Sequence, residues 1–122
     1  MHPFRLATAA ALLLAAPALG QPAAVTIDVQ NFSFAPKPIH LRAGQPVTLT
    51  LVNRSGSSHD FTAAKFFAAS RITAGAAPDG EIELAGHATR SITLIPAAGT
   101  YKAHCGHFMH KQMGMSDVII VD

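Results

Sequence analysis

Seven side chains that can bind a metal ion lie close together near the C-terminal end of this 122-residue sequence. A thiol, three imidazoles and three thioethers fall between positions 104 and 115, as His104, Cys105, His107, Met109, His110, Met113 and Met115. Magnesium and calcium prefer oxygen ligands, whereas thiolate, thioether and imidazole suit copper. The cluster therefore indicates a site for a soft or borderline metal ion.

Within this cluster, we expect Cys105, His110 and Met115 to bind one ion. The segment lies between two predicted strands, and a loop between adjacent strands brings the ends of a ligand set together. Two alternatives stay open, because His107 competes with His110 and Met113 competes with Met115. A single cysteine cannot form an internal disulfide, and a lone thiol in an oxidising compartment must be buried, partnered or metal-bound.

The elements that would position these donors are short strands. Apolar residues alternate with polar ones, or form short apolar runs, within 25–29, 47–51, 81–84, 91–94 and 118–121, with Gly- and Pro-rich turns between. Segment 63–70 lacks alternation and is rich in helix formers, so it predicts a short helix whose Phe66 and Phe67 pack on the core. The pattern favours an antiparallel β-sandwich or barrel of about 100 residues.

A second histidine for the site comes from an earlier part of the chain. His59 follows the predicted strand that ends near Asn53, and we expect it at the same rim of the sandwich. Alternation along the strand before Cys105 sends His104 to the opposite face. Tyr101 has the same parity as Cys105, so we expect a core aromatic whose hydroxyl bonds to the backbone.

The composition fits one exported domain. Hydrophobic residues make up 49% and charged residues 13% of the chain, and the formal net charge is +2, which favours neither disorder nor nucleic-acid binding. Residues 1–20 resemble a secretory signal peptide, with Arg5 before an apolar run and small residues near Gly20. The run is shorter than the about 20 residues that span a bilayer. We therefore expect a signal peptide at 1–20, a domain at 21–122 and a periplasmic or secreted location without stable membrane insertion.

The ligand candidates stand in a motif that resembles the cupredoxin (type 1 blue-copper) family. The resemblance rests on the sequence around four of them and on the terminal strand: Asn53 with His59-Asp60-Phe61, Gly99-x-Tyr101-x3-Cys105, Cys105-x4-His110-x4-Met115 with Gly114, and Val118-Ile119-Ile120-Val121. It covers the chain from about Val25 to the end. It implies an all-β Greek-key sandwich with one short helical segment.

The resemblance also implies the ligand roles and the function. His59, Cys105 and His110 would form a trigonal set around one type 1 copper ion, and Met115 would be the axial ligand. The chain would then be a periplasmic electron-transfer protein that cycles Cu(II)/Cu(I), with a transient redox partner, and not an enzyme. We expect a monomer. The rim around His110 would include Phe108, Met109 and Met113.

Two further interpretations are weighed against electron transfer. A copper-binding or delivery module would pass the ion to an acceptor, using His104, His107, Met109 and Met113 as transfer ligands. A structural zinc site could combine Cys105 with three histidines, His59, His107 and His110.

One position departs from the family pattern. In many cupredoxins a hydroxyl residue follows the cysteine and bonds to the polar residue after the first histidine. Gly106 follows Cys105 here, so a side-chain tie to Asp60 is not expected and the role of Asp60 is in doubt.

Overall fold

The computed structural model of the chain describes residues 3, 21–107, 109–110 and 112–122. The proposed signal peptide, apart from Pro3, lies outside the described residues. The strands of the described part are β1 (Ala23–Gln30), β2 (Ser33–Ala35), β3 (Ile39–Leu41), β4 (Val47–Asn53), β5 (His59–Thr62), β6 (Arg71–Ala74), β7 (Glu81–Leu84), β8 (Thr89–Ile95), β9 (Gly99–His104) and β10 (Ser116–Val121). They are joined by one α-helix, α1 (Ala64–Ala69), and a 3-10 turn, η1 (Pro78–Gly80). No helix in these described ranges is long and apolar enough to cross a bilayer.

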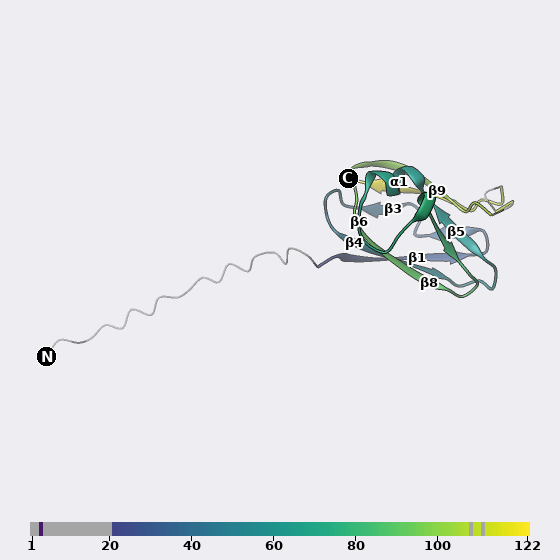
Figure 1. The fold of residues 1–122 in the computed structure, drawn as a ribbon, viewed down its shortest axis with the longest axis horizontal. Coiled ribbons are helices and arrows are strands. Elements are labelled where there is room, and N and C mark those ends of the chain that lie inside the picture. Colours follow the sequence, from purple (N-terminus) through teal and green to yellow (C-terminus); the bar gives the residue numbers. More distant parts are fainter. Residues whose placement is uncertain (1–2, 4–20, 108, 111) are drawn as a thin grey trace.

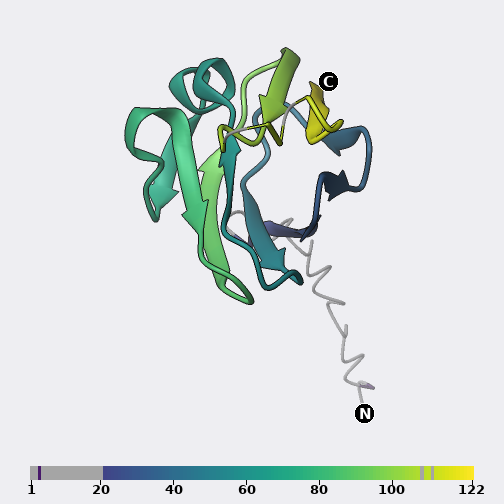
Figure 2. The ribbon, with the colours of Figure 1, turned by 90° about the vertical axis from the view of Figure 1, so that its right-hand side faces the viewer.

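The strands form two five-stranded sheets that pack face to face (Figures 1 and 2). Their orders are β2-β1-β4-β8-β6 and β3-β10-β9-β5-β7. The predicted all-β sandwich with one short helix is confirmed. Each sheet also contains one parallel pair, β1 with β4 and β3 with β10, beside the antiparallel pairs.

Strand pairing in the second sheet sets the position of the ligand loop. β9 and β10 are antiparallel, and their register runs from Gly99 opposite Val121 to His104 opposite Ser116. The connection between them therefore leaves from one end of the sandwich (Figure 1). β5 joins β9 at the same end through Thr62 opposite His104. Two segments more than forty residues apart thus lie side by side.

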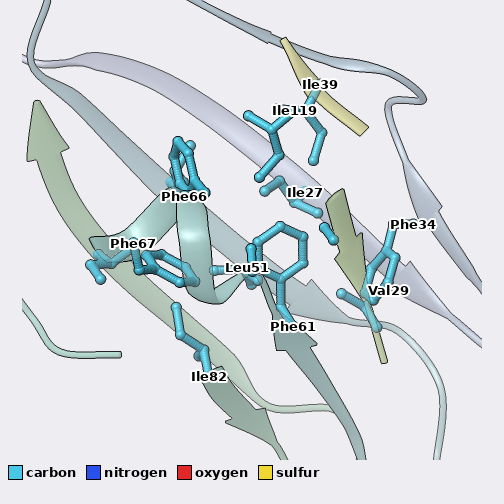
Figure 3. Packing of buried hydrophobic residues seen from close by; sticks show 14 of the residues in the cluster. Ile27, Val29, Phe34, Ile39, Leu51, Phe61, Phe66, Phe67, Ile82 and Ile119 are labelled. Carbon is cyan, nitrogen blue, oxygen red and sulfur yellow. The ribbon is translucent and has the colours of Figure 1, made fainter. Parts of the chain in front are cut away.

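Alternation along the strands builds the core between the sheets. In β4 every second residue from Val47 to Asn53 is buried, as expected for strands with one face inward. The inward side chains interlock around Phe61, which meets Phe34 edge-on at 5.3 Å between ring centroids (Figure 3). Fully burying a side chain of this kind stabilises the fold by about 1.5–3 kcal/mol.

The helix α1 packs against the core through adjacent phenylalanines. Phe66 and Phe67 are buried (Figure 3). Phe66 packs edge-on against Tyr101 with 5.5 Å between ring centroids. The hydroxyl of Tyr101 donates a hydrogen bond of 3.0 Å to the carbonyl of Ala97. The expected core roles of Phe66 and Phe67 are confirmed. Tyr101 is half-buried and packs against the core, and the expected bond from its hydroxyl to the backbone is present.

Candidate metal centre

Three of the predicted donors converge at one end of the sandwich. Nδ1 of His59 lies 3.1 Å from Nδ1 of His110. Sγ of Cys105 lies 3.4 Å from Nδ1 of His110 and 3.9 Å from Nδ1 of His59. The structure therefore brings the lone thiol together with one imidazole from β5 and one from the β9–β10 connection.

The spacing and chemistry of these donors fit a single transition-metal ion. Metal–nitrogen and metal–sulfur distances of about 2.0–2.3 Å place neighbouring ligand atoms roughly 3–4 Å apart. The side chains of His59 and Cys105 are 0% and 1% exposed, and His110 is half-buried. Two imidazoles and one thiol are the donors of a trigonal copper site.

Backbone hydrogen bonds fold the ligand loop back on itself. The amide of Cys105 donates to the carbonyl of Met115 at 3.1 Å, and the amide of Met115 donates to the carbonyl of His110 at 3.0 Å. Gly114 takes φ +89°, a conformation that favours glycine, immediately before Met115. The loop therefore brings the backbone of Met115 next to the backbone of Cys105.

The turn between β1 and β2 supports the two histidines. Oδ1 of Asn31 lies 3.0 Å from Nε2 of His59, so Nε2 would carry the proton and leave the lone pair of Nδ1 facing the other donors. Phe32 contacts His110 edge-on at 5.2 Å between centroids. The backbone of Phe32 has φ +67°, which is strained for a bulky residue, and its ring lies against both histidines.

Neither Asn31 nor Phe32 was predicted from the sequence. The Asn-Phe pair ends an alternating strand, as many turns do, and its contact with His59 depends on how β1 lies beside the other sheet. An aromatic residue next to a turn asparagine is the only local signal, and it is weak.

Burial shifts the pKa values of two donors in opposite directions. Desolvation raises the pKa of the Cys105 thiol, while hydrogen bonds from the amides of Asp60 and His107 act against the rise. Desolvation lowers the pKa of His59, and the charges of His110 and His107 lower it further. The site therefore favours a neutral His59 imidazole, the form that binds a metal. A bound metal ion would displace the thiol proton of Cys105.

The profile of the family described as "Cupredoxin-like domain" matches residues 4–121. The chain belongs to this family. No curated protein matches it.

Solved structures of three auracyanins share the cupredoxin fold. The dithionite-reduced auracyanin from Roseiflexus castenholzii superposes with a TM-score of 0.64 and 22% identity, over 84% of this chain and 99% of that chain. Auracyanin B gives 0.61 and 21%, over 84% and 91%. Auracyanin A from Chloroflexus aurantiacus, described as a "blue" copper protein, gives 0.62 and 20%, over 84% and 100%.

Burial separates the two methionines that compete as axial ligand in this cupredoxin. Met115 is 0% exposed and directly precedes β10, whereas Met113 is 55% exposed. The amide of Cys105 also donates to the carbonyl of Met115, so the buried methionine lies next to the cysteine along the fold. That Met115 is the axial ligand stays a prediction.

The backbone supplies the tie to Asp60 that the side chain of Gly106 cannot. The amide of Gly106 donates a hydrogen bond of 2.7 Å to Oδ1 of Asp60. The hydroxyl of Thr62 donates to the same oxygen at 2.7 Å. The amide of Asp60 in turn donates to Sγ of Cys105 at 3.4 Å. No side-chain bond joins residue 106 to Asp60, as expected. Asp60 nevertheless has a role at the site, because it links Gly106, Thr62 and Cys105 by hydrogen bonds.

The other two histidines of the cluster, His104 and His107, do not belong to the group of three converging donors. His104 is half-buried and opposes Thr62 across the strands. Nε2 of His107 lies 2.6 Å from Oε1 of Glu83, so His107 does not complete the zinc set considered from the sequence. Phe108, expected at the rim, lies outside the described residues.

Asn53 braces the loop that leads into His59. Its Nδ2 donates to the carbonyls of Ser57 and Ala85 at 2.8 and 3.0 Å, and its Oδ1 accepts from the hydroxyl of Ser55 at 2.8 Å. Because Asn53 is buried, these bonds satisfy an amide that would otherwise be costly to bury. They fix the approach of β5 to the centre.

Proposed function

We propose that this cupredoxin transfers single electrons through one copper ion held by His59, Cys105, His110 and Met115. The observation that supports the proposal is the convergence of Sγ of Cys105 with Nδ1 of both histidines within 3.9 Å. Copper would supply the one-electron Cu(II)/Cu(I) couple.

The residues around the donors perform separable tasks in this proposal. Asn31 orients His59, and the amide of Asp60 donates to the sulfur of Cys105, which favours its ionised form. His59 and Cys105 belong to or directly follow strands of a sandwich, so their donor atoms stay in place when the charge of the site changes. A site that moves little keeps the reorganisation on electron transfer small.

The exposed side of the centre is the proposed route for electrons. His110 is half-buried, and Met109 and Met113 of the same loop are 47% and 55% exposed. Small apolar rims suit the small, transient interfaces of redox proteins. The pattern of residues 1–20 supports export, so we place the proposed activity in the periplasm or outside the cell.

The test is to add copper to the purified domain and record its visible and electron paramagnetic resonance spectra. We expect intense visible absorption from thiolate–copper charge transfer and a narrow copper hyperfine splitting. Cys105→Ser and His110→Gln should abolish both features. His104→Gln, which changes a half-buried histidine outside the donor group, is the matched control and should keep them. Colourless copper-loaded protein would reject the proposal.

Copper delivery is the second candidate function. The exposed thioethers of Met109 and Met113, which no described contact requires for packing, favour it. Delivery predicts rapid loss of copper to a competing chelator in the reduced state, slowed by Met109→Leu with Met113→Leu. Electron transfer predicts retention of copper in both redox states and no effect of the two substitutions on release.

A further inference from the structure

A second group of metal-binding side chains lies on the outer face of the β5–β7 pair. Oε1 of Glu83 is 2.6 Å and Oδ2 of Asp60 is 3.7 Å from Nε2 of His107. One ligand atom from each residue lies within 4.8 Å of the others. We propose that Asp60, Glu83 and His107 form a second cation site, for a borderline divalent ion such as zinc.

Strand register places two negative charges face to face at this position. Asp60 on β5 is directly opposite Glu83 on β7. Like charges opposite each other across a strand pair are destabilising. Only the ring of His107, at the start of the ligand loop, reaches both carboxylates among the described residues. A divalent cation would offset both charges.

The side chain of Asp60 is held with one oxygen aimed at the group. Asp60 is only 4% exposed, and its Oδ1 accepts the hydrogen bonds from Gly106 and Thr62. Within the described residues, Oδ2 has no hydrogen-bond donor, and it faces His107. Because Oδ1 already accepts two hydrogen bonds, Oδ2 is the carboxylate oxygen that can bind a cation beside His107.

The donor set determines which ion fits. Two carboxylate oxygens and one imidazole nitrogen, with a fourth position open to solvent, are ligands that zinc accepts in tetrahedral sites. The ion would bind the lone pair of Nε2 in the imidazole form of His107 that carries its proton on Nδ1, and a second proton on Nε2 would pass to solvent. The set contains no sulfur donor, which distinguishes it from the group around Cys105.

The two sites are close enough to influence each other. The ring of His107 stacks on that of His110 at 5.6 Å between centroids and an interplanar angle of 13°. Asp60 also directly follows His59 and donates its amide to Cys105. A positive charge here would favour the less charged Cu(I) state and raise the reduction potential. This coupling rests on the proposed function, whereas the cation site itself does not.

Calorimetric titration of zinc into the copper-loaded protein tests the site. We expect one additional zinc ion per chain. Glu83→Gln and His107→Gln should each weaken binding at least about tenfold, because loss even of an outer partner costs 10–100-fold in metal affinity. Glu81→Gln is the matched control, since Glu81 is exposed on the same face of β7 two residues earlier and opposes uncharged Thr62. It should leave zinc affinity unchanged.

Retained visible colour shows that each variant is folded. No zinc uptake by the copper-loaded protein, or uptake that Glu83→Gln and His107→Gln leave unchanged, would overturn the site. If the protein is colourless with copper, the same titration on the Cys105→Ser protein decides the site separately, again by comparing Glu83→Gln with Glu81→Gln. A titration with excess Cu(II) in place of zinc tests whether the second site binds copper as well as zinc. A second copper signal with wide hyperfine splitting, lost in Glu83→Gln, would show that the site also accepts copper.

Discussion

The backbone amide of Gly106 donates a 2.7 Å hydrogen bond to Oδ1 of Asp60, which joins the residue after the buried cysteine to the residue after the buried histidine. The reverse contact is also made, because the amide of Asp60 donates to Sγ of Cys105. These two bonds link the ligand loop to β5. They therefore hold His59 and Cys105 at a defined separation.

Removal of the Asp60 carboxylate should destabilise the protein. Asp60→Ala leaves the amide of Gly106 and the hydroxyl of Thr62 without their acceptor, and we expect the free energy of unfolding to fall by about 1–3 kcal/mol. Urea unfolding of the metal-free protein measures this change.

Asp60→Asn is the control for this prediction, because its Oδ1 can still accept both hydrogen bonds. It should lose clearly less stability than Asp60→Ala. Equal losses in the two variants would show that the charge, and not the hydrogen bonds, is what matters at this position.

Asn31 should contribute to metal affinity without being a ligand. Asn31→Ala removes the acceptor for Nε2 of His59, so the imidazole loses its fixed orientation. We expect copper affinity to fall about 10–100-fold, the usual effect of removing an outer partner of a ligand histidine. Competition with a chelator of known affinity measures it. Gln30→Ala, at the neighbouring exposed position, should change affinity less than twofold.

The two methionines should respond differently to truncation. Met115 is fully buried, so Met115→Ala should lower the free energy of unfolding of the metal-free protein by about 2–5 kcal/mol. Met113→Ala, at an exposed position, should stay within about 0.5 kcal/mol of the original protein.

Voltammetry of the copper-loaded protein separates packing from ligation. Met115→Leu conserves volume and should keep the fold, yet it should shift the reduction potential because an axial thioether tunes it. Met113→Leu should leave the potential unchanged. The opposite pattern would make Met113 the axial ligand.

Asp117 should make stability depend on pH. Its side chain is 2% exposed, and within the described residues its Oδ2 has no hydrogen-bond partner. Desolvation raises the pKa of Asp117 above its ordinary value of 3.8, although the amide of Val118 and the charge of Lys37 act against the rise. The folded state thus holds the proton more tightly than the unfolded state. Stability from this group is complete below pH 3.8 and is lost as the pH rises through the raised pKa.

Asp117→Asn removes this loss, since it cannot ionise. We expect the stability of the variant, relative to the original protein, to increase from pH 3 toward pH 7 in urea unfolding of the metal-free protein. A difference that stays constant over this range would mean that the carboxyl group titrates alike in both states.

Much of the fold could be predicted from local patterns. Alternation identified β1, β4, β7 and β8, and a short apolar run identified β10. The break in alternation identified α1 with buried Phe66 and Phe67. The strands β2 and β3 have three residues each, which is too few for a period of two to be distinguished from a turn. All four residues of β6 are exposed, so this strand has no buried face to produce alternation. The sequence places His59 in the segment after the strand that ends near Asn53. In the structure His59 is the first residue of a further strand, β5, because it pairs with Leu84 of β7.

The sequence alone determined which residue types could bind a soft metal ion. Cys105, His110 and Met115 lie within one loop, and the preference of their side chains for such ions does not depend on the fold. Only the tertiary structure decided which histidine faces the thiol, which methionine is buried, and that Asn31, Phe32 and the amide of Gly106 surround the centre. The physical reason is that these contacts join segments distant along the chain. Strand pairing sets them, and a backbone amide looks the same in every residue type except proline.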